Sequence, residues 1–452
     1  MFTIRLRRNV AIASASLIMM GTATTGLLSG NAQAAPATPG VTAHSITIGA
    51  SVPLSGLAVS YKNVSGAANA VFQWVNKHGG VNGRKINYIR LDDCYNLAAY
   101  GLGCTAGAST TTLSVNQKLV AQDHVFATVG SLGTAAQESV LSYLKQNGVP
   151  QLFVNSGSST WNQPSAYPNL FGFQTSYQAE GKIFAHYIKT HFAGKKVGFI
   201  GQNDDFGADG YTGLMDGGLT IAPSDHLNYN AADAITGSSN DIQQDIATLK
   251  ADGVGVVVLD SVPAFTAGIL QIAGLESYSP QWVISSVGSD PTSVNSVAEG
   301  GAVTMTEFPA FSQTSDPWIP WLRKVLMADP TDFPGLTAKT VLTGNEIYGA
   351  SYAVAFVETL KATGKNVTRA SFVKTLTSTN LSTPAIIPLR YSKSNHQGLM
   401  GGTIAIVAGN GSKPPVDVFE GNTDVFTTTN APSSPLKASS KFTITAIPSW
   451  LK

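Results

Sequence analysis

Serine and lysine occur twice at a spacing that could support nucleophilic catalysis. Ser142 with Lys145, and Ser371 with Lys374, match Ser-x-x-Lys, the nucleophile pattern of penicillin-recognising enzymes. Neither copy has the Ser-Asp-Asn or Lys-Thr-Gly companion motif, and both fall in amphipathic segments where a lysine is simply solvated. The chain also has no Gly-x-Ser-x-Gly elbow, His-Glu-x-x-His site, phosphate loop or dinucleotide fingerprint. These patterns predict a protein that is not an enzyme and needs no cofactor.

A strand-helix-strand unit spans residues 46–93. Residues 46–52 predict an apolar strand, and residues 86–91, closing on Asp92 and Asp93, predict a second. Between them, apolar side chains recur at helical spacing, which predicts one buried helix face ending near Gly79: Ala68, Val71, Phe72 and Val75. Such a unit feeds a parallel sheet whose ligands bind beyond the carboxyl ends of the strands. Residues 53–61 are expected at that edge.

The turn Asn-x-x-Gly-Gly-Val-x-Gly-Arg, from Asn76 to Arg84, and the aspartates that follow it resemble a known family. The family is that of the periplasmic solute-binding proteins of the leucine/isoleucine/valine-binding type, the receptor subunits of ABC importers. Residues 129–134, 148–159 and 205–207 continue the resemblance, which covers nearly all of residues 45–410. It implies a type I α/β fold of two lobes, each a mostly parallel sheet flanked by helices, joined by a three-segment hinge.

Alternating strand and helix patterns, read with this resemblance, divide the chain. The first lobe is expected from residues 45–175 and again from 304–388, and the second from 176–303. The strand at residues 302–305 would return the chain to the first lobe, and the last crossing is expected near residues 388–391. Residues 389–452 would complete the second lobe and end in a loosely ordered tail, because they are rich in Ser, Thr, Pro and Asn.

The resemblance also implies ligand-binding residues. In the family, hydroxyls and backbone N–H groups at loop-to-helix junctions of the first lobe hold the ligand's carboxylate. The matching positions are Thr134 and the run Gly157, Ser158 and Ser159, although each could equally be only a helix cap or turn. Tyr61 and Phe206 match aromatic positions that close over the ligand, and both are expected in loops.

One departure from the family concerns the ligand's ammonium group. Where the amino-acid binders present an acid and a tyrosine from the second lobe, this chain has Ser286 and Val262. A buried ammonium without a carboxylate is costly, so another acid would have to substitute. Asp260 is the best substitute, with Asp290 and Asp204 as weaker candidates, although Asp260 could equally cap a helix starting near Pro263. An amide, an organic acid and an amino acid held by Asp260 stay open as ligands.

The N-terminus predicts export. Basic residues precede an apolar run at residues 10–28, and Ala32-Gln33-Ala34 offers a cleavage site, so residues 1–34 are expected to be a signal peptide. No cysteine lies near that site for lipid attachment. The chain's two cysteines, Cys94 and Cys104, are expected to form a disulfide in an exported protein. Their spacing and the scattered histidines give no metal site.

Composition fits an exported binding protein. Charged residues make up 12% of the chain and the formal net charge is +1, so there is no basic stripe for nucleic acid. The sequence therefore predicts a monomeric, periplasmic or extracellular receptor that captures a small amino acid, amide or organic acid by hinge closure. Its partners would be an ABC permease and its ATPase. A binding protein that reports its ligand to a signalling partner is the alternative, because fold does not fix function.

Overall fold

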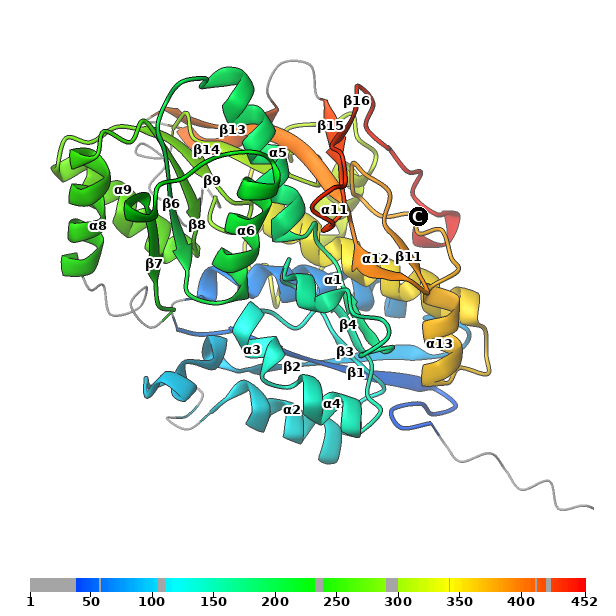
Figure 1. Ribbon diagram of the computed structural model, residues 1–452. Coiled ribbons are helices and arrows are strands. Elements are labelled where there is room, and N and C mark those ends of the chain that lie inside the picture. Colours follow the sequence, from blue (N-terminus) through cyan, green and yellow to red (C-terminus); the bar gives the residue numbers. More distant parts are fainter. Residues whose placement is uncertain are drawn as a thin grey trace, which may run out of the picture. The chain divides into compact units, whose positions relative to one another are not determined.

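The computed structural model describes most of the chain after residue 37. The described residues are 38–56, 58–104, 107, 110–231, 239–289, 300–340, 342–410, 413–419 and 424–452. The predicted signal peptide and Asp290 lie outside them. Within these ranges, two sheets with helices packed on them form the α/β architecture expected from the sequence (Figure 1).

The first sheet is entirely parallel, in the order β2-β1-β3-β4-β5. Its strands are β1 (Ser45–Val52), β2 (Lys85–Asp92), β3 (Thr128–Val129), β4 (Gln151–Val154) and β5 (Leu170–Gly172). Its helices are α1 (Lys62–Lys77), α2 (Thr112–Ala121), α3 (Thr134–Glu138), α4 (Leu141–Gln146), α11 (Trp318–Met327), α12 (Gly344–Thr363) and α13 (Arg369–Leu376). The predicted apolar face of α1 is buried, from Ala68 to Val75. Two short helices, α3 and α4, follow each other between β3 and β4.

The second sheet is mixed, in the order β16-β15-β13-β10-β9-β8-β6-β7, with β14 paired to β13. Its strands are β6 (Val197–Gln202), β7 (His226–Tyr229), β8 (Val256–Asp260), β9 (Gln281–Ile284), β10 (Val303–Thr306), β13 (Gly401–Asn410), β14 (Lys413–Phe419), β15 (Val425–Thr427) and β16 (Lys437–Ser439). Its helices are α5 (Tyr177–His191), α6 (Asp205–Asp216), α8 (Ser239–Ala251) and α9 (Pro263–Leu275).

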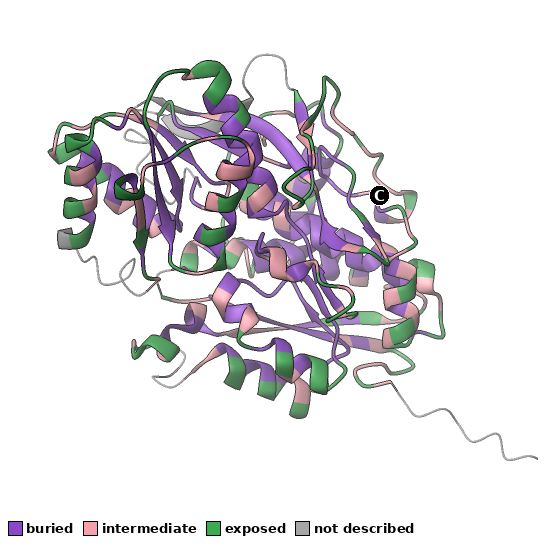
Figure 2. Cartoon of the chain, viewed as in Figure 1, coloured by how far each residue is buried: buried purple, intermediate pink, exposed green. Residues whose placement is uncertain are grey.

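Strand β8 shows why this sheet is buried on both faces. Val256 and Val258 belong to one apolar cluster, whereas Val257 and Leu259 belong to another on the opposite face. The uninterrupted apolar run is what a parallel strand covered on both sides requires. Figure 2 shows the central strands of both sheets buried, while the helices expose their outer faces.

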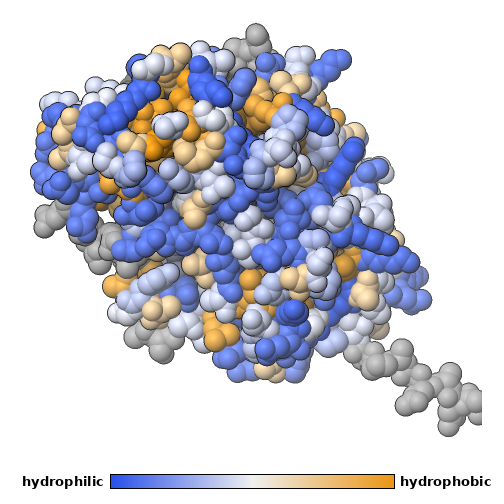
Figure 3. Space-filling model, viewed as in Figure 1, coloured by the Kyte–Doolittle hydropathy of each residue, from blue (hydrophilic) through white to orange (hydrophobic). Residues whose placement is uncertain are grey.

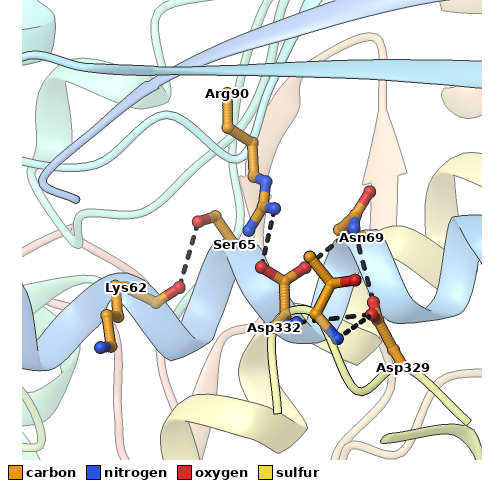
Figure 4. A network of polar contacts seen from close by, with 7 residues as sticks. Lys62, Ser65, Asn69, Arg90, Asp329 and Asp332 are labelled. Atoms are coloured by element: carbon orange, nitrogen blue, oxygen red, sulfur yellow. Dashed lines mark hydrogen bonds and ion pairs between the residues drawn. The ribbon is translucent and has the colours of Figure 1, made fainter. Parts of the chain in front are cut away.

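Strand β10 remains in the second sheet, between β9 and β13, so the chain leaves that sheet only after Thr306. Residues beyond it then pack on the first sheet. Asn69 of α1 and Arg90 of β2 bind Asp332, which follows α11, with the Arg90–Asp332 ion pair at 2.8 Å (Figure 4). This polar network ties the returning segment to the first strand-helix-strand unit.

Three chain segments lie side by side where the chain passes between the sheets. The Leu399 N–H donates to the Phe173 carbonyl, and the Gly401 N–H donates to the Thr175 hydroxyl. The Thr175 N–H in turn donates to the Glu307 carboxylate at 3.0 Å. A separate hairpin of β11 (Arg390–Ser392) and β12 (Asn395–Gly398) precedes the last passage. The third passage thus lies at residues 399–401.

The end of the C-terminal segment contacts the first lobe. The indole N–H groups of Trp74 and Trp321 both donate to the Leu451 carbonyl at 3.1 Å, and the Leu451 side chain is buried. The polar composition of the segment hid this anchoring, because its contacts combine backbone carbonyls with a few scattered apolar residues: Phe442, Ile447, Trp450 and Leu451. The tail therefore returns to α1 and α11 of the first lobe.

Candidate functional site

A cavity of about 100 Å³ lies beyond the carboxyl ends of the strands, with walls from both sheets' loops. On the first side it begins with Tyr61, in the short 3-10 helix Val59–Tyr61 that links β1 to α1. Leu132, Gly133 and Thr134 join it where β3 leads into α3. This is the edge predicted from the strand-helix-strand unit.

Hydroxyl groups at the start of α3 form a small network. The Thr134 and Ser156 hydroxyls are 2.7 Å apart, and the Tyr177 hydroxyl lies 3.5 Å from Thr134. Asn155, after β4, also lines the cavity. Thr134 therefore takes its predicted place on the cavity wall.

The second side is supplied by α6 and by the loop after β9. Phe206 is fully buried and lies against Tyr177, with ring centroids 4.4 Å apart. It occupies the first turn of α6, because Asp204 caps that helix by accepting from the Phe206 N–H at 2.9 Å. The expectation of a loop at Phe206 was wrong, since α6 begins at Asp205. Ser286 and Val287 complete this wall.

Tyr61 also bridges the two sides. Its hydroxyl donates to the Val287 carbonyl at 2.8 Å, so a ring from the first side closes onto the second. Tyr61, Thr134, Phe206 and Ser286 are thus the predicted residues that the structure brings together around one cavity.

Gly157, Ser158 and Ser159 do not line this cavity. A Cβ on Gly157 would lie 2.7 Å from the Thr175 carbonyl, so glycine is needed for packing. Ser158 is fully buried and its hydroxyl donates to Glu138. Ser159 donates its N–H and its hydroxyl to Asp209 of α6, at 2.6 and 3.1 Å. A carboxylate of the protein itself therefore occupies this junction, and a ligand role for the three residues stays a prediction.

Asp260 is buried at the end of β8, outside the cavity wall. It is not a helix cap, because α9 begins after Val262 without any side-chain cap hydrogen bond. Burial, and then the nearby charges of Glu180 and Asp209, raise the pKa of Asp260 well above its usual range. Val262 packs in the adjacent apolar cluster, and Asp204 is the α6 cap.

Several residues of the cavity wall were not predicted, and Glu307 is the most important. It follows β10 directly, is 4% exposed, and lines the cavity between Thr306 and Phe308. Burial raises the pKa of Glu307 to about 7. Its place just after a strand that ends at the ligand edge was the available signal. Tyr95, Tyr177 and Tyr348 were also missed, because aromatic residues are more often core.

Tyr95 belongs to the loop closed by the disulfide between Cys94 and Cys104, which confirms that prediction. Tyr95 has φ 58°, an unusual left-handed conformation for a tyrosine. Its side chain packs against apolar clusters of both sheets. The cross-linked loop therefore holds an aromatic ring across the cavity.

Comparison with known proteins gives a family and several related folds. The family model described as periplasmic binding protein matches residues 45–412. No curated protein sequence matches. A possible leucine/isoleucine/valine-binding protein from Rhodopirellula baltica has TM-score 0.70 at 19% identity, covering 83% of this chain and 96% of the other. A fatty acid ABC transporter substrate-binding protein from Thermomonospora curvata has TM-score 0.71 at 17% identity, covering 88% of this chain and 96% of the other.

A third similar structure is a branched chain amino acid ABC transporter protein from Thermus thermophilus with bound valine. Its TM-score is 0.68 at 18% identity, and the alignment covers 83% of this chain and 97% of that one. At these identities the structures share a fold, and their ligands differ. The fold therefore does not name the ligand, which must be inferred from the residues of the cavity.

Proposed function

Because the chain belongs to the periplasmic binding protein family, we propose that it is the extracytoplasmic substrate-binding subunit of an ABC importer. It captures a small molecule between its lobes and presents the closed complex to a permease. The observation that carries this proposal is the cavity itself, whose wall draws residues from both sheets' loops. A ligand there touches both lobes at once, which is what closure around a ligand requires.

Size supports a small ligand. The internal volume of about 100 Å³ suits a small molecule rather than a polymer. Hydrogen-bonding groups alternate with rings around the wall, as in sites that orient one small molecule.

Contacts between the lobes support hinge closure as the mechanism. Ser159 bonds to Asp209, and the Thr160 hydroxyl donates to Asp205 at 3.2 Å, so two consecutive residues after β4 meet one face of α6. Tyr61 meets Val287 on the other side of the cavity. The ligand would add to these contacts and shift the population toward the closed form, which the permease would then recognise.

Export supports the same role. The predicted signal peptide at residues 1–34 would place the receptor in the periplasm or at the cell surface, where the predicted disulfide forms. Among the described residues, no helix has the length and apolar character needed to span a membrane. The face shown in Figure 3 is mainly hydrophilic.

A thermal-shift screen tests the proposal. Residues 35–452 would be heated with amino acids, amides, amines, and aromatic or aliphatic acids. A ligand at ~100 times its dissociation constant adds about 2.7 kcal/mol to the free energy of unfolding, a readily measured rise in midpoint. Stabilisation by one chemical class is expected. No stabilisation by any class would contradict a small-molecule receptor.

A further inference from the structure

The cavity wall has an unbalanced charge. Its rings come from Tyr61, Tyr95, Tyr177, Phe206, Phe308 and Tyr348. Its other polar side chains are hydroxyls and amides, and Glu307 is the one carboxylic acid among the described residues that line it. Among those lining residues there is no lysine, arginine or histidine. Aromatic faces attract cations and do not attract anions, so the rings and the carboxylate both favour a positively charged ligand.

Glu307 is held in place by the segments that pass between the lobes. Its carboxylate accepts from the Thr175 N–H at 3.0 Å, and its carbonyl accepts from the Ile386 N–H at 2.8 Å. Binding does not have to order this side chain, so little entropy is lost when it meets a ligand. Because an ammonium favours the ionised form of a nearby acid, a carboxyl group fixed in this way discriminates between ligands by the charge they carry.

A second buried acid lies directly behind the wall. Glu180 of α5 accepts from the N–H of Ser286, a lining residue, at 2.7 Å. Burial, and after it the charge of Glu307, raises the pKa of Glu180 to about 8. The ion pairs of the described residues join Arg90, Lys118 and Lys196 to other aspartates, so neither glutamate has a basic partner there.

We propose that the cavity selects ligands carrying a protonated amine, and that Glu307 is the residue that binds this group. The proposal rests on the receptor function proposed above and names its substrate class. The ammonium would donate to Glu307, lie among the tyrosine and phenylalanine rings, and relieve the repulsion between Glu307 and Glu180.

Glu307 does not occupy the position from which the second lobe was expected to supply an acid. That position holds Ser286, whose N–H is taken by Glu180. The acid comes instead from the chain segment between β10 and α11. Because this segment lies between the lobes, an ammonium bound to Glu307 would contact the part of the chain that bends during closure.

Matched compounds and matched variants test the proposal. Isothermal titration would compare isopentylamine with 3-methylbutan-1-ol, phenethylamine with 2-phenylethanol, and leucine with its 2-hydroxy acid. The variants are Glu307→Gln and, as control, Glu358→Gln. Glu358 of α12 is a partly buried acid that also accepts one backbone N–H, from Ser382, but it does not line the cavity. Its pKa is likewise raised by burial to about 7.

The expected result is binding of at least one amine, no binding of its hydroxyl counterpart, and affinity about thirtyfold or more weaker in Glu307→Gln. Glu358→Gln should bind as the wild type does. The proposal is overturned if the hydroxyl or carboxylic acid compounds bind as tightly as the amines, or if Glu307→Gln keeps full affinity. Binding of acids alone would reject this inference while sustaining the receptor function, whereas absence of binding by every class would reject both.

Discussion

Replacing Asp209 with asparagine should weaken ligand binding without changing any residue that lines the cavity. Asp209 accepts three hydrogen bonds, from the Ser159 N–H, the Ser159 hydroxyl and the Gln178 side chain. The first two join α6 to the loop after β4, so they form only when the lobes are together. The Gln178 bond stays within the second lobe, between α5 and α6.

The size of the effect follows from these bonds. Asparagine keeps one acceptor oxygen and loses the charge, so at least one charged hydrogen bond between the lobes is lost, about 1.5 to 3 kcal/mol. This cost falls on the closed form alone, because in the open form water replaces Ser159. The closed population, and with it the apparent affinity, should fall by about tenfold to a hundredfold.

The assay is isothermal titration with the ligand found by the thermal-shift screen, on wild type, Asp209→Asn and Gln178→Ala. Gln178→Ala removes a bond to the same carboxylate but leaves the contact between the lobes, so its affinity should stay close to that of the wild type. If Asp209→Asn folds normally and binds as tightly as the wild type, the contact with Ser159 does not contribute to closure, and that part of the mechanism is refuted.

Three further predictions concern stability. Burial makes the pKa of Glu307 higher in the folded state than in the unfolded state. The ligand-free protein should therefore lose stability as pH rises from about 5 to 8, which urea titrations at several pH values would measure. In Glu307→Gln the free energy of unfolding should fall less steeply with pH. In Gly349→Ala, the new Cβ would lie 1.9 Å from the Val64 carbonyl oxygen, so α1 and α12 must separate. The cost of about 1 to 3 kcal/mol should appear as a lower melting midpoint, and an unchanged midpoint would contradict this packing. Deleting residues 441–452 removes the Leu451 carbonyl that accepts from Trp74 and should lower the free energy of unfolding by about 1 to 3 kcal/mol; equal stability would show that the tail is not anchored.

Periodic patterns predicted the elements that build the lobes. The α1 face and the doubly buried β8 were predictable, because each depends on a repeating apolar pattern that burial imposes directly. Phe206 was wrongly expected in a loop, because Asp204 caps α6 with a side-chain hydrogen bond that apolar periodicity does not reveal. The anchored tail was missed for a similar reason, because backbone carbonyls have no sequence signature.

The part of the cavity wall that was predicted comes from the loops that follow the first strands of the chain. Tyr61 and Thr134 were found because they follow β1 and β3 at the ligand edge. Ser159 was expected to face a ligand, but a carboxylate 50 residues later in the chain meets it, and no local pattern encodes that contact. Glu307 was missed because its role depends on three segments that meet only in the folded chain.

The most direct test of hinge closure is small-angle X-ray scattering of residues 35–452 with and without saturating ligand. With ligand, the scattering should match the structure described here, in which Tyr61 meets Val287 and Ser159 meets Asp209. Without ligand, the radius of gyration should be larger, and Asp209→Asn should require more ligand to reach the compact form. Identical scattering curves with and without a bound ligand would contradict capture by closure.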